Sequence, residues 1–264
     1  MSFSPPVMHN GQRLQKIEVP RELEGYLDGT LFLRGPIMDE AGGDPEKAWR
    51  ALGGPGTGIG LIAPVQVHGT AILDEKRVLA LPTRPRADGI LLYKGQCAGS
   101  LRFADCFPLL LSSCHPHPWA LMLHAGFEGT ARGIVPRSIE FLENRVPGFR
   151  IEKTYAWIGP GIGSCCYQRE KGRDAKTALG IRNLPASSWI DLGERVRFDI
   201  PKAIGLQLFS AGLPRDRLFE YGLCTSCNPD QLYSYRAGDL FARTLFLVRS
   251  GPAVHKFHPW WENI

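Results

Sequence analysis

The chain has 264 residues with 44% hydrophobic side chains, so it can bury a sizeable core within one large domain. Its 31 basic and 26 acidic residues are dispersed and leave a formal net charge of +5, which argues against a nucleic-acid partner and suits a pocket for an anionic ligand. No apolar run reaches the length of a membrane span, and residues 1–16 lack the apolar core of a signal peptide. Seven cysteines, an odd number, fit reduced thiols. We therefore expect a cytoplasmic protein with no membrane partner.

The chain begins with a segment that carries no chemistry of its own. Residues 1–20 contain a Pro-Pro pair and are expected to form a loosely attached lead-in, whereas residues 21–264 are expected to form a single domain. The β-prone run from Gly29 to Leu33 predicts a strand that ends at Arg34. An arginine in that place is either a surface charge or an anion clamp, because the guanidinium offers a fixed fork of donors.

A capped helix and a glycine-rich loop come next. Asp44 suits an N-cap and Pro45 suits the first helical position, which predicts a helix that reaches Leu52. The glycine-rich residues 53–60 lack the Lys-Ser/Thr pair that a phosphate-binding P-loop requires, so they are expected to be a flexible loop. The following strand, Leu61 to Val67, ends at His68, a side chain with ligand chemistry.

Two short apolar runs near the middle carry further chemically useful side chains. They are Phe107 to Leu111 and Trp119 to Leu123, and each predicts a buried strand. Cys106 precedes the first run and His124 follows the second, so the two side chains are expected to lie on neighbouring strands. A thiolate and an imidazole at strand ends suit a zinc or copper site. The alternative is a buried structural cysteine beside a hydrogen-bonded core histidine.

The second half predicts two helices, over about 134–144 and 201–211, and contains two pairs of thiols. Cys165 and Cys166 follow a glycine-rich turn, and if that segment is extended only one of them faces the substrate. Cys224 and Cys227 form a CxxC without a partner CxxC, so they are expected to be structural thiols. The tail, with two adjacent tryptophans at 260–261, is expected to dock on the body. Strands outnumber helices and do not alternate strictly with them, which predicts a layered mixed α/β or α+β domain.

Several strings in one order resemble a single family, the YfiH/YlmD-type laccase-domain proteins, also called the polyphenol oxidase or peptidoglycan-editing-factor family. The resemblance extends over roughly residues 31–248. The matching strings are QVHG at 66–69, ADG at 87–89, ADCFPLLL at 104–111, HAGFEGTARGI at 124–134, IGPGIGSCCY at 158–167 and LCTSCNPDQLYSYR at 223–236.

The resemblance implies a four-layer α/β/β/α fold and a metal site of two histidines and one cysteine. On the matching motifs, these ligands are His68, Cys106 and His124. It also implies zinc-dependent purine nucleoside phosphorylase chemistry, with adenosine deaminase and methylthioadenosine phosphorylase activity. The substrates would then be a nucleoside and phosphate. An older attribution within the family is copper-dependent oxidation of phenols.

The chain departs from the family pattern in three places. The family usually reads HAGWRG, whereas this chain has Phe127-Glu128 in place of Trp-Arg. Arg132 lies four residues after Glu128, one helical turn away, and is a candidate to replace the lost arginine. The segment around Arg34 is also altered, and Ala242-Arg243 stands where the family has Gly-Arg.

The proposed chemistry assigns roles to the remaining polar residues. Three protein ligands leave zinc an open position for water, which the metal activates for attack on C6 of adenine. Phosphorolysis needs an anion pocket, for which the candidates are Arg34, Arg132 and Arg243, and Cys166 is a candidate to line the substrate site. Asp105 and Asp88 are candidates to orient a ligand or carry a proton. The alternatives are a copper oxidase, a metal-free cysteine hydrolase with Cys106 as nucleophile, and a binding protein without enzymatic activity.

Overall fold

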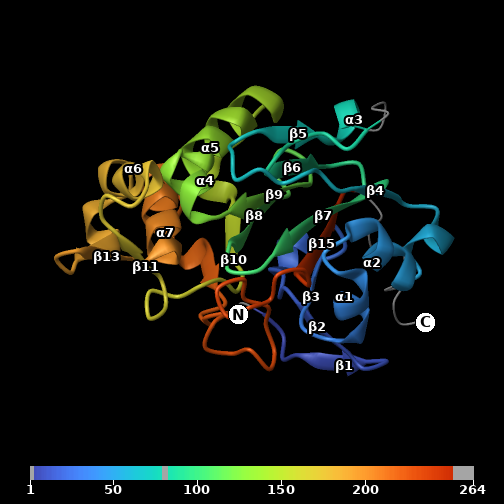
Figure 1. Ribbon diagram of the computed structural model, residues 1–264. Coiled ribbons are helices and arrows are strands. Elements are labelled where there is room, and N and C mark those ends of the chain that lie inside the picture. Colours follow the sequence, from blue (N-terminus) through green and yellow to red (C-terminus); the bar gives the residue numbers. More distant parts are fainter. Residues whose placement is uncertain (1–2, 79–82, 252–264) are drawn as a thin grey trace.

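Two six-stranded sheets stack face to face between two groups of helices (Figure 1). The computed structural model describes residues 3–78 and 83–251. The first sheet has the order β1-β2-β3-β15-β7-β4, the second β14-β10-β8-β9-β6-β5, and a small third sheet β11-β13-β12. The strands are β1 Val7–His9, β2 Gln12–Lys16, β3 Leu27–Phe32, β4 Gly60–Ile62, β5 Ile72–Asp74, β6 Gly89–Leu92, β7 Cys97–Phe103, β8 Phe107–Ser113, β9 Trp119–Ala125, β10 Tyr155–Ile158, β11 Gln168–Glu170, β12 Trp189–Asp191, β13 Arg195–Phe198, β14 Leu218–Glu220 and β15 Thr244–Ser250.

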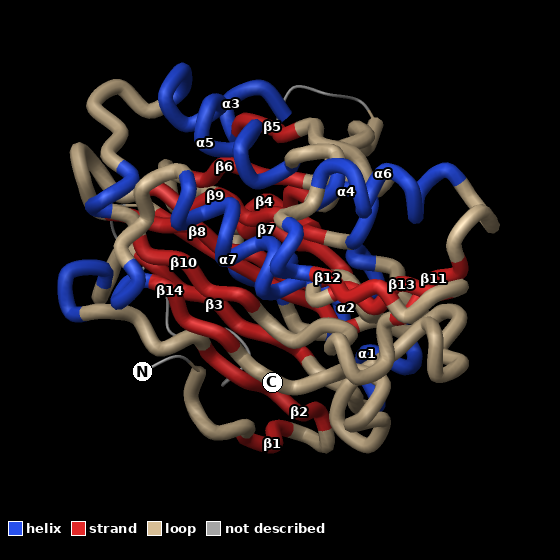
Figure 2. Tube along the Cα trace, turned by 90° about the vertical axis from the view of Figure 1, so that its left-hand side faces the viewer, coloured by secondary structure: helices blue, strands red, loops and turns tan. Residues whose placement is uncertain are grey.

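The helices cover the two outer faces of the stacked sheets. Helices α1 and α2 lie on the first sheet, and α4 to α7 lie on the second (Figure 1). Figure 2, turned by 90°, shows α5 and α7 in front of strands β8 to β10. The helices are α1 Pro36–Ala41, α2 Pro45–Ala51, α3 Glu75–Val78, α4 Phe127–Ala131, α5 Ile134–Arg145, α6 Ala175–Asn183 and α7 Ile200–Ser210.

Each space between neighbouring layers holds its own buried apolar cluster. Met38 and Trp49 pack with Phe32 between α1, α2 and the first sheet. Leu101 and Leu110 belong to a second cluster between the two sheets. The third cluster fills the space between the second sheet and α4 to α7. The layers are therefore α/β/β/α, and the mixed α/β fold predicted from the sequence is confirmed.

Strands β8 and β9 form the centre of the second sheet and are buried along their whole length. Both faces of this sheet are covered, which explains why the sequence shows continuous apolar runs there rather than alternation. The two strands pair antiparallel, with Pro108 opposite His124. This register brings Cys106, immediately before β8, beside His124 near the end of β9, as the sequence predicted.

Local signals in the sequence fix the helices. The Asp44 side chain caps α2 by accepting hydrogen bonds from the backbone amides of Glu46 (2.8 Å) and Lys47 (3.2 Å). Helices α5 and α7 begin and end within a residue or so of the predicted bounds. None of the helices in the described ranges has the length and apolar character that a bilayer span requires.

The N-terminal segment is part of the first sheet, so the expectation of a loosely attached lead-in was wrong. Strand β2 pairs with β3, with Leu14 opposite Phe32. The Leu14 side chain is buried, and the Gln12 amide donates a 2.7 Å hydrogen bond to the Leu33 carbonyl. Strand β3 pairs in turn with β15 from the far end of the chain, so this segment extends a sheet that is completed only in the folded protein, and short-range patterns do not report such pairing. The two tryptophans of the tail lie outside the described residues.

Candidate active site

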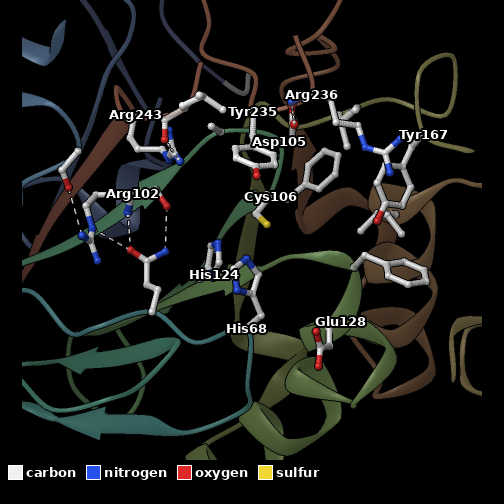
Figure 3. A pocket seen from close by; sticks show the side chains of 18 of the residues that line it. His68, Arg102, Asp105, Cys106, His124, Glu128, Tyr167, Tyr235, Arg236 and Arg243 are labelled. Carbon is white, nitrogen blue, oxygen red and sulfur yellow. Dashed lines mark hydrogen bonds between the residues drawn. The ribbon is translucent and has the colours of Figure 1, made fainter. Parts of the chain in front are cut away.

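Three side chains with metal-binding atoms converge at one edge of the stacked sheets. His68 follows β4 in a loop, Cys106 precedes β8, and His124 lies in β9. One ligand atom from each lies within 4.8 Å of the other two, and the two imidazole centroids are 4.9 Å apart. Figure 3 shows all three side chains pointing toward a common space. The structure thus brings together the three residues predicted from the sequence, and two nitrogens with one sulfur suit a borderline-soft metal.

A buried carboxylate, Asp88, holds the ring of His124 and the backbone of the loop that carries His68. It precedes β6, and its carboxylate accepts a 2.8 Å hydrogen bond from Nδ1 of His124. It also accepts backbone hydrogen bonds from Val67 (3.2 Å), His68 (3.0 Å) and Gly69 (2.7 Å). One carboxylate therefore fixes both the ring of His124 and the loop that carries His68. Second partners of this kind orient metal ligands and raise their basicity.

The hydrogen bond to Asp88 determines which nitrogen of His124 is available. Nδ1 carries the proton in this pairing, which leaves the Nε2 lone pair for a metal. Burial lowers the pKa of His124 more than the bond to Asp88 raises it, so the ring is neutral. Burial alone would raise the pKa of Asp88, but the bonds from His124 and Gly69 prevail and keep it lowered. Burial, followed by the nearby Asp105 and Asp88, raises the pKa of the Cys106 thiol to about 12.

Two residues of the site adopt backbone conformations that only glycine reaches easily. His68 has a φ of 58° and Asp105 a φ of 83°. Such strain persists only where surrounding contacts hold it, and it is common at functional sites. The backbone amide of His68 is held by Asp88. The sequence patterns gave no sign of this strain, because neither position is a glycine.

Asp105 connects the site to the C-terminal part of the chain. Its carboxylate accepts hydrogen bonds from the Thr225 hydroxyl (2.7 Å) and the Arg236 backbone amide (2.9 Å). Its carbonyl accepts one from the Ile162 amide (2.8 Å). These contacts fix the backbone immediately before Cys106. Asp105 therefore positions the thiol and draws two distant loops to the site.

Gly126 allows the close approach of Cys106. A Cβ atom added at Gly126 would lie 2.5 Å from Sγ of Cys106 and 3.4 Å from Cδ2 of His68. Any side chain there would displace the thiol. Gly126 is thus required because a side chain there would crowd Cys106 and His68. Its φ of −80° is ordinary for any residue.

The three donors open into a cavity of about 720 Å³, a size that suits a nucleoside. Its lining contains more basic than acidic side chains, and the acidic ones are Asp105 and Glu128. Arg243 and Arg236 lie on opposite sides of Cys106 in Figure 3. The basic lining residues are Arg102, Arg169, Lys176, Arg236 and Arg243. This charge distribution favours an anionic ligand.

The predicted anion contacts divide into one that lines the cavity and two that do not. Arg243 lines it and is held by three carbonyls of residues 239–242. Arg34 is outside the lining, because its guanidinium pairs with Asp239 at 2.6 Å and stacks on Tyr233. Arg132 is also outside the lining and is more than half exposed, at 54%.

Cys166 does not line the cavity either, contrary to the prediction. The Cys166 amide donates to the Gly163 carbonyl at 3.0 Å, so this segment turns instead of continuing as a strand. The Cys166 thiol lies 3.4 Å from that of Cys227. A turn places consecutive side chains differently from the alternation of an extended segment.

Phe127 and Glu128, where the sequence was expected to depart from the pattern that it resembles, are built into the cavity wall. Phe127 packs on Phe198 with centroids 4.8 Å apart. Glu128 pairs with Arg132 at 2.7 Å and with Lys176 at 2.6 Å. The reversed charge is therefore balanced by two cations, one of which, Lys176, also lines the cavity.

Several residues that line the cavity were not predicted from the sequence. Arg169 lies in β11 and Lys176 lies in the first turn of α6, so both come shortly after the matching string that ends at Tyr167 but outside it. Arg169 lies over the Phe127 ring at 4.8 Å, and Arg236 lies over the Tyr167 ring at 4.5 Å. Arg236 was within the matched C-terminal string, which was the one signal available for it.

Comparisons with known proteins give a consistent result. The sequence model of the family described as multi-copper polyphenol oxidoreductase laccase matches residues 47–247. Purine nucleoside phosphorylase YlmD of Geobacillus stearothermophilus is 31% identical over 158 residues, 58% of this chain and 55% of that protein. A purine nucleoside phosphorylase of Xylella fastidiosa is 27% identical over 179 residues, 65% of each chain. The matched part thus spans about half to two thirds of these relatives.

The crystal structure of Geobacillus YlmD has the same fold, with a TM-score of 0.74 at 22% identity over 93% of this chain and 98% of that one.

Proposed function

The chain belongs to the multi-copper polyphenol oxidoreductase laccase family, and from this premise we propose that it is a zinc-dependent purine nucleoside phosphorylase. We further propose that the same site deaminates adenosine and phosphorolyses methylthioadenosine. The relatives that carry the name purine nucleoside phosphorylase support the first part. The second part rests on the resemblance and on the metal chemistry of the donor set.

The observation that carries the proposal is a three-donor site at the wall of a cationic cavity. His68, Cys106 and His124 supply three ligands, and their common space opens to the cavity. Catalytic zinc takes three protein ligands and keeps its fourth position for water or substrate. When bound there, zinc would lower the pKa of a water molecule toward neutrality. Asp88 holds the two histidines and so acts as a positioning residue.

The cavity offers separate surfaces for the two parts of the reaction. Arg243 and Arg236 are suited to bind phosphate, because their guanidinium groups match its oxygens. The exposed side chains of Tyr235, Leu240 and Phe241 also line the cavity and offer faces on which a purine can stack. Phosphate held beside the ribose C1′ would displace the base, and the cations would stabilise the developing negative charge.

The donor set favours zinc over copper electron-transfer chemistry. A His₂Cys copper site usually has a weak axial methionine, and none of the cavity-lining residues is methionine. Oxidases of the multicopper type use several histidine-rich sites. Among the groups of potential ligands in the described ranges, the one with two histidines is the group of His68, Cys106 and His124 already described. The copper oxidase is therefore the second candidate, supported by the family description alone.

The metal-free cysteine hydrolase fits the geometry less well. A nucleophilic cysteine needs a thiolate. Burial and two neighbouring carboxylates raise the pKa of Cys106 to about 12, so without a metal the thiol keeps its proton at neutral pH. Metal coordination favours the thiolate directly. We therefore assign Cys106 to metal binding.

The test combines metal analysis with product chromatography. Purified protein is incubated with adenosine, with and without phosphate. Adenine plus ribose 1-phosphate reports phosphorolysis, and inosine reports deamination. We expect phosphorolysis that requires phosphate, and we expect His124→Ala to lose both zinc and activity. Arg132→Ala is the matched control, because this arginine lies outside the cavity lining.

Two results would overturn the assignment. One is full phosphorolysis by a His124→Ala protein that contains no metal. The other is phenol oxidation by copper-loaded protein together with no nucleoside turnover by the zinc-loaded form. The second result would establish the copper oxidase in its place.

A further inference from the structure

Four cysteines from two distant parts of the chain form a second cluster. Cys165 and Cys166 follow the glycine-rich segment after β10, and Cys224 and Cys227 follow β14. Their sulfur atoms all lie within 4.8 Å of one another. The Sγ of Cys227 lies 3.6 Å from that of Cys165 and 3.4 Å from that of Cys166. None of the four lines the cavity at His68 and His124.

The sulfur spacing matches a tetrahedral metal site. A Zn–S distance of about 2.3 Å places the sulfurs of a tetrahedral site about 3.8 Å apart. The two measured distances from Cys227 are close to this value. All four thiols are free, and these separations are far from the S–S length of about 2.05 Å in a disulfide. Four cysteines with this spacing are typical of structural zinc sites.

We propose that Cys165, Cys166, Cys224 and Cys227 bind one zinc ion in a closed, structural site. This site is distinct from the one formed by His68, Cys106 and His124, and it does not depend on the proposed activity. The lone CxxC finds its partners in an adjacent Cys-Cys pair, not in a second CxxC. The pairing is visible only in three dimensions, because about sixty residues separate the two halves.

The backbone around the cluster is arranged to support thiolates. The Gly163 amide donates a hydrogen bond to Sγ of Cys224 at 3.2 Å. A Cβ atom at Gly163 would lie 3.1 Å from Cβ of Cys224 and 3.2 Å from Sγ of Cys165, so a side chain would crowd the sulfurs. The Cys166 amide and the Gly163 carbonyl close a turn here, and the thiols of Cys165 and Cys166 both lie close to that of Cys227. Amide donors to sulfur stabilise the deprotonated ligand.

The site would fasten two loops that form the wall of the cavity. Gly161 and Cys224 already form a parallel β-bridge, and the Thr225 amide donates to the Gly161 carbonyl at 3.0 Å. The Thr225 hydroxyl in turn binds Asp105, the residue before Cys106. A zinc ion at the four thiols would therefore stabilise the position of Asp105 through Thr225. It would reduce the freedom of the loop without contacting the substrate.

The binding step involves proton release and no oxidation. Four thiols lose four protons, and the four thiolates with Zn²⁺ give a site of net charge −2. The protons pass to the buffer, so binding strengthens as the pH rises. No electron acceptor is required.

Zinc stoichiometry in matched variants tests the proposal. Full-length protein is purified with a non-thiol reductant, loaded with zinc and desalted. We expect about two zinc ions per chain in the wild type, about one in Cys227→Ser, about one in His124→Ala and none in the double variant. Cys97→Ala is the matched control, since Cys97 lies in β7, outside the groups of potential metal ligands and outside the cavity lining, and it is expected to retain two. The zinc that remains in Cys227→Ser shows that this variant is folded.

A second measurement identifies the ligands. Cobalt in a four-thiolate site gives intense sulfur-to-metal charge-transfer absorption, and one thiolate gives much less. We expect most of this absorption to disappear in Cys227→Ser and to persist in His124→Ala. If the histidine site binds no metal, the wild type holds one zinc and Cys227→Ser none, so the proposed function fails while this proposal stands.

Equal zinc content in the wild type and Cys227→Ser would overturn the proposal. So would a disulfide between Cys227 and Cys165 or Cys166 that survives in reductant-treated protein, found by peptide mass analysis. Either result would assign the cluster to thiol chemistry without a metal.

Discussion

Replacing Asp88 by asparagine tests whether one buried carboxylate supports the metal site. The carboxylate accepts hydrogen bonds from the His124 ring and from the amides of Val67, His68 and Gly69. In Asp88→Asn, one oxygen becomes an NH₂ group that can only donate. The less costly orientation keeps the oxygen that faces His124 and His68. The new NH₂ group then faces the Gly69 amide, where Asp88 accepted a bond at 2.7 Å.

The size of the effect follows from these contacts. The half-buried Gly69 amide would then lack an acceptor, which costs up to about 1–3 kcal/mol of folding free energy. Loss of a second partner of a metal ligand typically weakens metal binding about 10- to 100-fold. We therefore expect Asp88→Asn to lower apo-protein stability by about 1–3 kcal/mol and zinc affinity by about tenfold or more. Asp88→Ala removes every acceptor and is expected to lose more of both.

Two assays separate stability from metal binding. Denaturant unfolding of the apo protein gives the stability, and competition with a chromophoric chelator gives the zinc dissociation constant. Asp216→Asn is the control, because this aspartate is exposed on a short helix away from the cavity. A zinc dissociation constant for Asp88→Asn within about twofold of the wild type would refute the role given to the carboxylate.

Three further predictions concern the rest of the cavity. Arg243→Lys is expected to raise the KM for phosphate about tenfold, because lysine lacks the bidentate fork of arginine. Arg132→Ala is the control and is expected to leave this KM unchanged. Equal effects of the two substitutions in initial-rate assays would contradict the role given to Arg243. Burial would raise the pKa of Glu128, but its ion pairs lower it. The pairs thus stabilise the fold by up to about 1 kcal/mol above about pH 4.5, the ordinary pKa of this carboxyl group. This advantage over Glu128→Gln, measured by urea titration, should be lost as the pH falls below that value. Gly126→Ala is expected to lose zinc by elemental analysis, because its Cβ would lie 2.5 Å from the Cys106 sulfur; normal zinc content would show that the thiol can shift.

Local sequence signals predicted those features that depend on neighbours in the chain. The Asp44 cap and Pro45 predicted α2, and the apolar run before His124 predicted β9. Such signals depend on backbone hydrogen bonds and burial within a few residues. The matching strings also identified the three donors. Cys106 and His124 lie beside strand ends, whereas His68 lies in the loop between β4 and β5.

The side-chain environment of the anion contacts depended on pairs far apart in the sequence. Arg34 was a candidate phosphate contact until its pairing with Asp239, some two hundred residues later, accounted for its guanidinium. Arg132 has the expected helical spacing from Glu128, but the orientation of α4 places it outside the cavity lining. Sequence spacing gives the face of a helix and leaves open which neighbour covers that face.

The sequence by itself determined the layered mixed α/β class, the capped helices and the identity of His68, Cys106 and His124 as a potential ligand set. The tertiary structure decided that Asp88 holds the two histidines, that residues 7–16 complete the first sheet, and that Cys227 meets the Cys165-Cys166 pair. The physical reason is the range of the interactions. Caps and apolar periodicity act over one or two turns, whereas strand pairing, buried hydrogen bonds and ligand clusters join residues that meet only when the layers pack.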